Sequence, residues 1–79
     1  MSKFENPFVK AKREAIQLTL QLIEDKGEQG ILNTELVATL ELYGYSDRTV
    51  RSYLKVLHTL NLIRWDGDRW FFVEEGKPQ

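Results

Sequence analysis

Side chains that could bind a polyanion recur at helical spacing after Ser46. At about 100° per residue, one arc of a helix over this segment carries basic and hydroxyl-bearing residues: Arg48, Arg51, Ser52, Lys55, His58 and Thr59. Arginine can form two hydrogen bonds with guanine, and serine or threonine can bind either bases or phosphates. The arc has the chemistry of a surface that reads duplex DNA, although an ordinary solvated helix face can have the same composition.

The helix that would carry these residues has a start signal and a stop signal. Ser46 is a good N-cap, and Asp47, the one acid near the arc, suits the positive end of the helix dipole. Asn61 tolerates positive φ and is expected to end the helix. The side opposite the arc is apolar and is expected to face the core: Val50, Tyr53, Leu54, Leu57 and Leu60.

A second, shorter helix is expected just before this one. Asn33 is predicted to cap a helix over 34–43, and Gly44 then supplies a tight turn between two tyrosines. Three apolar residues of this helix are expected to face inward: Leu36, Val37 and Leu40.

Two aromatic and β-branched runs, 62–65 and 69–73, flank Asp66-Gly67-Asp68 and predict a β-hairpin. A two-residue turn at Gly67-Asp68 would set Asp66 opposite Arg69 and Trp65 opposite Trp70. We interpret the aromatic face of this hairpin, with Ile63 and Phe72, as core. The alternative is a stacking platform for single-stranded nucleic acid. The stub Ile31-Leu32 could add a short strand to the hairpin.

Two short helices joined by a Gly-containing turn form a helix-turn-helix unit, and a hairpin directly after them is a wing. The stretch 46–57, followed by Leu60-Asn61-Leu62-Ile63, resembles the recognition helix and strand entry of winged helix-turn-helix regulators. Where this chain has Asn61, that family often has Gly. The resemblance covers 31–73, and the first helix only by position. It implies an α+β, mainly α fold over 6–73. The polar segments 1–5 and 74–79 are expected to be flexible.

The resemblance and the basic arc together predict which residues contact double-stranded DNA. On the helix they are Ser46, Arg48, Thr49, Arg51, Ser52 and Lys55. On the hairpin they are Arg64 and Arg69, but Asp66 and Asp68 at its tip would repel phosphate, so the wing is expected to be a minor contact. Basic residues near the N-terminus could also reach phosphates, or could form i,i+4 pairs such as Lys10 with Glu14: Lys3, Lys10, Lys12 and Arg13.

The first helix is expected to start at Asn6-Pro7 and to end at Lys26 before Gly27. It carries two apolar stripes. One stripe holds Phe8, Ala11, Ala15, Leu18 and Leu22, and the other holds Val9, Ile16, Leu20 and Ile23. Together they span roughly 200°, about twice what one core contact needs. Either a small domain wraps the helix on two sides, or the second stripe forms a homodimer interface. We expect the dimer, because a chain of 79 residues without cysteine is marginally stable alone.

Composition and the motifs that are missing argue against several other classes of function. The chain has no cysteine and one histidine, which leaves the usual zinc sites without ligands, and a net charge of −1 argues against a non-specific nucleic-acid coat protein. No apolar run approaches the ~20 residues of a membrane span. No phosphate loop or nucleophile motif is present. We therefore expect no enzyme activity, no metal and no cofactor. A small-molecule ligand is not expected either, because a domain this small has little room for a pocket of several hundred Å³.

These patterns predict a cytoplasmic, nucleoid-associated transcriptional regulator that binds double-stranded DNA sequence-specifically. The alternative is a winged-helix protein-interaction module of a replication or transcription assembly. The near-neutral charge and the acidic hairpin tip favour this alternative.

Overall fold

A computed structural model describes residues 7–74 of the chain. It has three α-helices and a three-stranded antiparallel sheet, so the predicted α+β, mainly helical class is confirmed. The elements are α1 (Pro7–Asp25), a 3-10 turn (Gly27–Gln29), β1 (Ile31–Leu32), α2 (Asn33–Leu42), α3 (Asp47–Thr59), β2 (Ile63–Asp66) and β3 (Arg69–Phe72). The predicted cap Asn6 and the predicted flexible ends, except Glu74, lie outside the described residues. In the described part of the chain, no helix has the length and hydropathy to cross a membrane.

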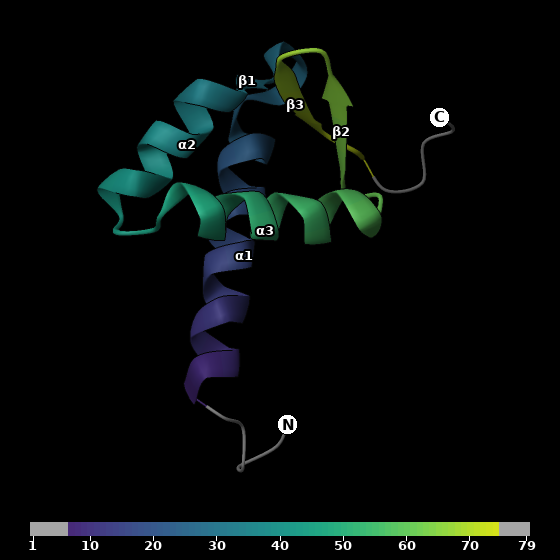
Figure 1. Ribbon diagram of the computed structural model, residues 1–79. Coiled ribbons are helices and arrows are strands. Elements are labelled where there is room, and N and C mark those ends of the chain that lie inside the picture. The colour runs from purple at the N-terminus through teal and green to yellow at the C-terminus, as the bar shows by residue number, and fades with distance from the viewer. Residues whose placement is uncertain (1–6, 75–79) are drawn as a thin grey trace.

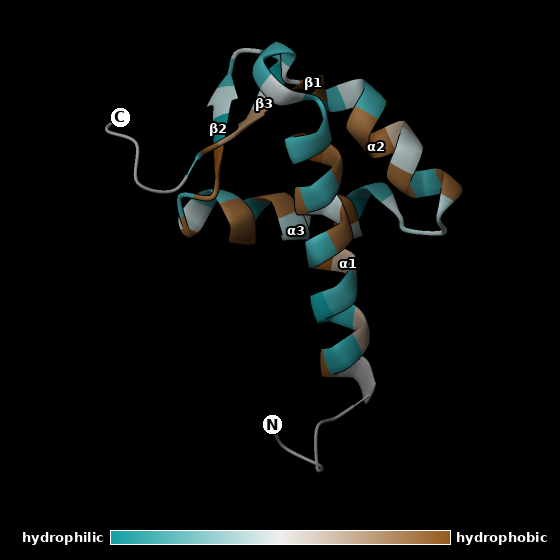
Figure 2. Ribbon diagram, turned by 180° about the vertical axis from the view of Figure 1, so that it is seen from behind, coloured by the Kyte–Doolittle hydropathy of each residue, from teal (hydrophilic) through white to brown (hydrophobic). Residues whose placement is uncertain are grey.

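The helices cross rather than run side by side. In Figure 1, α3 lies across the middle of α1, and α2 and the sheet lie on one side of this crossing. The N-terminal half of α1 extends past α3 on the other side, and the view from behind in Figure 2 shows the same projection. The C-terminal half of α1 thus packs within the domain, and its N-terminal half projects past α3.

The sheet has the order β1-β3-β2, so the predicted strand stub and hairpin are both confirmed. Asp66 lies opposite Arg69, and Trp65 lies opposite Trp70, in the predicted register. Gly67 has φ +74, and the Asp68 N–H donates to the Asp66 carbonyl oxygen at 2.8 Å, which closes the turn. Side chains alternate across a strand, so Arg64 and Phe71 lie on the face opposite the two tryptophans.

The core joins all of these elements. Its buried residues are Ile23, Ile31, Leu36, Leu40, Val50, Leu54, Leu57 and Ile63. On α1, the fully buried stripe is Ala15, Thr19 and Ile23, which runs between the two predicted stripes. The flanking residues Ile16, Leu18, Leu20 and Leu22 are half-buried against the same core. The Thr19 hydroxyl can be buried here because it donates a hydrogen bond to the Ala15 carbonyl oxygen at 2.8 Å.

The burial of α1 corrects the predicted dimer interface. Ile23 is fully buried within its own chain and has no surface to offer a second subunit, so its assignment to the interface was wrong. Ile16 and Leu20 also pack against the core, which leaves Val9, at 51% exposure, as the one mostly exposed residue of the four. The wide apolar arc of α1 therefore arises mainly because the small domain wraps the helix on two sides.

Two further expectations need correction. Asn33 does not cap α2 with its side chain; the helix begins at Asn33 itself, and the Asn33 Oδ1 accepts a hydrogen bond from the Trp70 indole nitrogen at 3.0 Å. Leu60 was expected to face the core but is 60% exposed, because α3 ends at Thr59 and the chain turns away. The predicted stops at Gly44 and Asn61 are confirmed by their φ values of +98 and +60.

Candidate nucleic-acid interface

The basic arc of α3 is a continuous exposed surface. Its six members are all exposed: Arg48, Arg51, Ser52, Lys55, His58 and Thr59. The other side of the helix fixes this orientation, because Val50, Leu54 and Leu57 are fully or almost fully buried in the core. We call this surface the α3 arc. The structure thus brings together the predicted residues Arg48, Arg51, Ser52 and Lys55 on one face, available to a partner.

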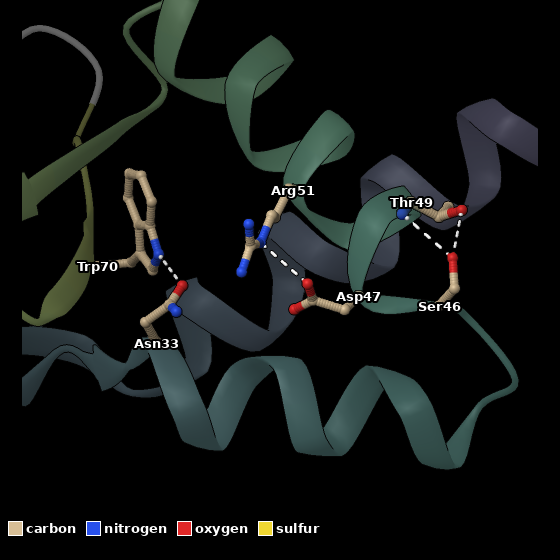
Figure 3. Close-up of polar contacts among 6 residues, drawn as sticks. All are labelled: Asn33, Ser46, Asp47, Thr49, Arg51 and Trp70. Carbon is tan, nitrogen blue, oxygen red and sulfur yellow. Dashed lines mark hydrogen bonds and ion pairs between the residues drawn. The ribbon is translucent and has the colours of Figure 1, made fainter.

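The N-terminal end of α3 is held by the predicted cap. The Ser46 Oγ accepts a hydrogen bond from the Thr49 backbone N–H at 3.2 Å, and the Ser46 hydroxyl donates to the Thr49 Oγ1 at 2.9 Å (Figure 3). Of these two predicted site residues, Ser46 is exposed and Thr49 is half-buried. Both therefore stabilise the helix end. Because the Ser46 proton goes to the Thr49 oxygen, the Thr49 hydroxyl proton can point to a further acceptor.

Arg51 has an acidic neighbour that the sequence argument treated only as a helix-end residue. Its Nε lies 3.0 Å from the Asp47 Oδ2, at i,i+4 spacing (Figure 3). Both side chains are substantially exposed, so the ion pair stabilises the fold little, of the order of 0–1 kcal/mol. It does, however, hold the guanidinium over the first turn of α3. Asp47 therefore competes with any anionic partner for Arg51.

An open groove lies between α3 and the projecting half of α1. It has a volume of about 490 Å³, and its lining includes Lys12 from α1, Tyr45 from the turn, and Arg48, Thr49, Ser52 and Tyr53 from the start of α3. We call it the α1–α3 groove. Of the predicted N-terminal cations, Lys12 joins Arg48 here, and Lys3 lies outside the described residues.

Two other N-terminal cations do not line this groove. Lys10 is exposed, and no ion pair joins it to Glu14 in the described part of the chain, so the i,i+4 pair suggested by their spacing does not form. Arg13 is also exposed. The basic contribution of α1 to the groove is therefore Lys12.

The hairpin arginines do not join the α3 arc. The Arg64 guanidinium carbon lies 4.5 Å from the centre of the Phe71 ring, in a cation–π contact on the sheet face opposite Trp70. Arg69 is half-buried and lies opposite Asp66 at the turn. Both predicted hairpin contacts are thus placed apart from the surface that carries the other basic residues.

An aromatic cluster borders the far end of the α3 arc, and sequence reasoning missed its link to the helix. The ring centres of Trp65 and Trp70 are 4.6 Å apart, and His58 meets Trp70 edge-on at 5.8 Å. Trp70 is half-buried, whereas Trp65 is 41% exposed. The aromatic face of the hairpin is therefore partly core, through Ile63, and partly surface. Helical spacing (i,i+7) puts His58 on the same edge of α3 as Arg51, but it does not show that the hairpin packs against that edge.

No family model, curated protein or solved structure matches the chain. Within residues 7–74, no three His, Asp or Glu side chains are grouped so that they could hold a metal ion. The candidate site consists of an exposed basic arc, a groove that continues it onto α1, and an aromatic border on the hairpin.

Proposed function

We propose that the chain is a winged helix-turn-helix protein that binds double-stranded DNA sequence-specifically, with α3 in the major groove. The observation that carries this proposal is the α3 arc, where three cations and three further polar side chains are exposed together. Helices α2 and α3 meet at the Gly44 turn, and the hairpin follows α3 directly, as the family resemblance requires. Under this proposal the protein acts inside the cell as a small transcriptional regulator.

Each part of the arc has a separate role. Arg51 and Lys55 lie where side chains can reach base edges, and Ser52 can serve either a base or a phosphate. Arg48 faces the α1–α3 groove and is placed for the backbone. The hairpin is a minor contact, because Arg64 is engaged by Phe71 and acids occupy the tip.

A homodimer is part of the proposal. Two copies would place two α3 helices about one turn of DNA apart on a pseudo-palindromic site. The support is the projecting half of α1, which extends past the core (Figure 2). Val9, in this half, is 51% exposed. Doubling the modest charge of one α3 arc would also raise the affinity for DNA.

The test is selection of bound sequences from a random duplex library, followed by binding of the selected duplex over a range of salt concentrations. Affinity for the selected duplex should fall steeply with salt and exceed that for a scrambled duplex by about 10³-fold or more. Lys55→Gln should weaken binding. Lys26→Gln is the matched control, because Lys26 pairs with Glu35 at 2.8 Å away from α3. No binding at low salt would contradict the proposal.

A second candidate function is a protein-interaction module. The observation that favours it is exposed apolar side chains at two separate places: Leu42 (89% exposed) and Tyr43 (61%) at the end of α2, and Leu60 (60%) after the far end of α3. A shallow groove of about 320 Å³ also runs along α3, and Val56 and Leu60 contribute to its lining. Leu42→Ser combined with Leu60→Ser would leave DNA binding intact if α3 reads DNA through its polar arc, and would abolish partner binding in the alternative.

A further inference from the structure

Two basic side chains line the α1–α3 groove. Lys12 stands on one wall and Arg48 on the other, and both are exposed. In the described part of the chain neither has an ion-pair partner, whereas Arg51 pairs with Asp47 and Lys26 pairs with Glu35. None of the described residues that line the groove carries a carboxylate. Two cations without a counter-charge therefore face one hollow.

The side chain of a buried tyrosine lines the same groove. Tyr53 is only 8% exposed and lines the groove, yet its hydroxyl has no hydrogen-bond partner within residues 7–74. Every fully buried side-chain oxygen there has a partner, so the small exposed part of Tyr53 includes its hydroxyl oxygen. Burial, and then the neighbouring Tyr45, raise the pKa of Tyr53, so the hydroxyl stays protonated and can donate. This hydroxyl opens into the groove and has no acceptor within residues 7–74, so it can donate to the oxygen of a ligand bound there.

The rest of the lining supplies further donors. The Thr49 hydroxyl accepts from Ser46, and its own proton is free to donate. Ser52 is exposed on the next turn of α3. Cations and neutral donors, without acids, are the set of groups that binds phosphate oxygens. The groove is open, and its volume of about 490 Å³ leaves room for a phosphate together with the sugar to which it is bonded.

We propose that the α1–α3 groove is a phosphate-binding site, in which Lys12 and Arg48 hold the anion and Tyr53 and Thr49 donate hydrogen bonds to its oxygens. The source of the phosphate rests on the proposed function: on duplex DNA it is a backbone phosphate beside the bases that α3 reads. A free phosphorylated ligand presents the same chemistry. The site would make α1 a DNA contact and fix the register of α3 on the duplex.

The experiment is an amide NMR titration of the full chain with two probes, inorganic phosphate and the selected duplex. Thr49, Ser52 and Tyr53 should shift saturably with either probe. Tyr53→Phe keeps the ring and removes the donor, and it should weaken binding of both probes several-fold. Lys12→Gln should weaken binding roughly tenfold and reduce the slope of log affinity against log salt by about 1. Lys26→Gln should change neither, and thermal unfolding of each variant checks that it is folded.

The two probes separate this inference from the proposed function. Duplex binding that is unchanged in both affinity and salt slope by Lys12→Gln and Tyr53→Phe would overturn the phosphate site and leave DNA binding in place. Groove shifts with inorganic phosphate but no duplex binding would support the site and contradict the DNA proposal. The absence of groove shifts with either probe would overturn the site.

Discussion

The indole nitrogen of Trp70 donates a hydrogen bond of 3.0 Å to the Oδ1 of Asn33, 37 positions away in the sequence (Figure 3). This bond joins β3 to the first residue of α2. The Asn33 backbone N–H donates in turn to the Asp68 carbonyl oxygen at 2.9 Å, so the same residue also holds the hairpin turn. Trp70 lies against His58 and Trp65, and Asn33 thereby helps to fix the aromatic border of the α3 arc.

Asn33→Ala should therefore destabilise the fold. It leaves a part-buried indole N–H without its acceptor, which costs about 1–3 kcal/mol of the free energy of unfolding. Urea denaturation measures this loss. Thr34→Ala, at the exposed neighbouring position, is the control and should change stability far less. A double-mutant cycle with Trp70→Phe should show that the two losses are not additive; additive losses would contradict a direct coupling.

Gly30 and Gly67 provide a matched pair for testing packing against backbone strain. Both have positive φ, +71 and +74. A Cβ at Gly30 would lie 2.7 Å from the Phe71 Cε1, whereas a Cβ at Gly67 would meet nothing within 4 Å. Gly30→Ala should therefore cost about 1–3 kcal/mol more unfolding free energy than Gly67→Ala, which carries the strain alone. Equal losses in urea denaturation would show that Phe71 moves aside without cost.

The elements with local signals were predictable from the sequence, and the contacts between distant segments were not. The ends of α2 and α3 are set by local signals: the Ser46 cap, and the positive φ of Gly44 and Asn61. These signals depend on only a few neighbouring residues. The hairpin register followed from the two residues of its turn. The role of Asn33 differs, because its partner Trp70 is far along the chain and a capping role was equally compatible with its position.

The candidate site likewise has one part that the sequence predicts and one part that it does not. The α3 arc was predictable, because helical periodicity alone places its members on one face. The α1–α3 groove was not, since it depends on the angle at which α1 crosses α3, and side-chain spacing within either helix carries no information about that angle. Thr19 shows the same limit on α1: the prediction placed it in neither apolar stripe, yet it is fully buried between them.

Asp47→Asn should strengthen DNA binding. The substitution removes the carboxylate that holds Arg51 at 3.0 Å, so the arginine no longer gives up an ion pair when it meets the duplex. We expect affinity at low salt to improve by roughly 0.5–1 kcal/mol, with a loss of about 0.3–1 kcal/mol in stability from the helix dipole. Fluorescence anisotropy with the selected duplex measures the affinity. Asp68→Asn, at the hairpin tip, removes the same charge away from α3 and is the control.

Arg51→Ala should weaken binding of the selected duplex by about 1–3 kcal/mol if the arginine reads a base. The loss should be larger for the selected duplex than for a scrambled one. In the Asp47→Asn background the same substitution should cost more, because Arg51 is then fully available. A loss equal for both duplexes would make Arg51 a backbone contact instead.

Val9→Glu should dissociate a homodimer formed through the projecting half of α1. Val9 is 51% exposed, so a charge there disturbs an interface without entering the core; Ile16 is half-buried against the core, and a charge there would unfold the domain instead. Light scattering should show the parent chain at twice the mass of the variant. Gln17→Glu, which adds the same charge on the exposed side of α1, should leave the dimer intact. Val9→Glu should then lose more affinity for a duplex with two half-sites than for one with a single half-site, because only the dimer can place both of its α3 helices on the DNA at once. A monomeric parent chain would contradict the dimer and leave single-site binding by α3 as the mode to test.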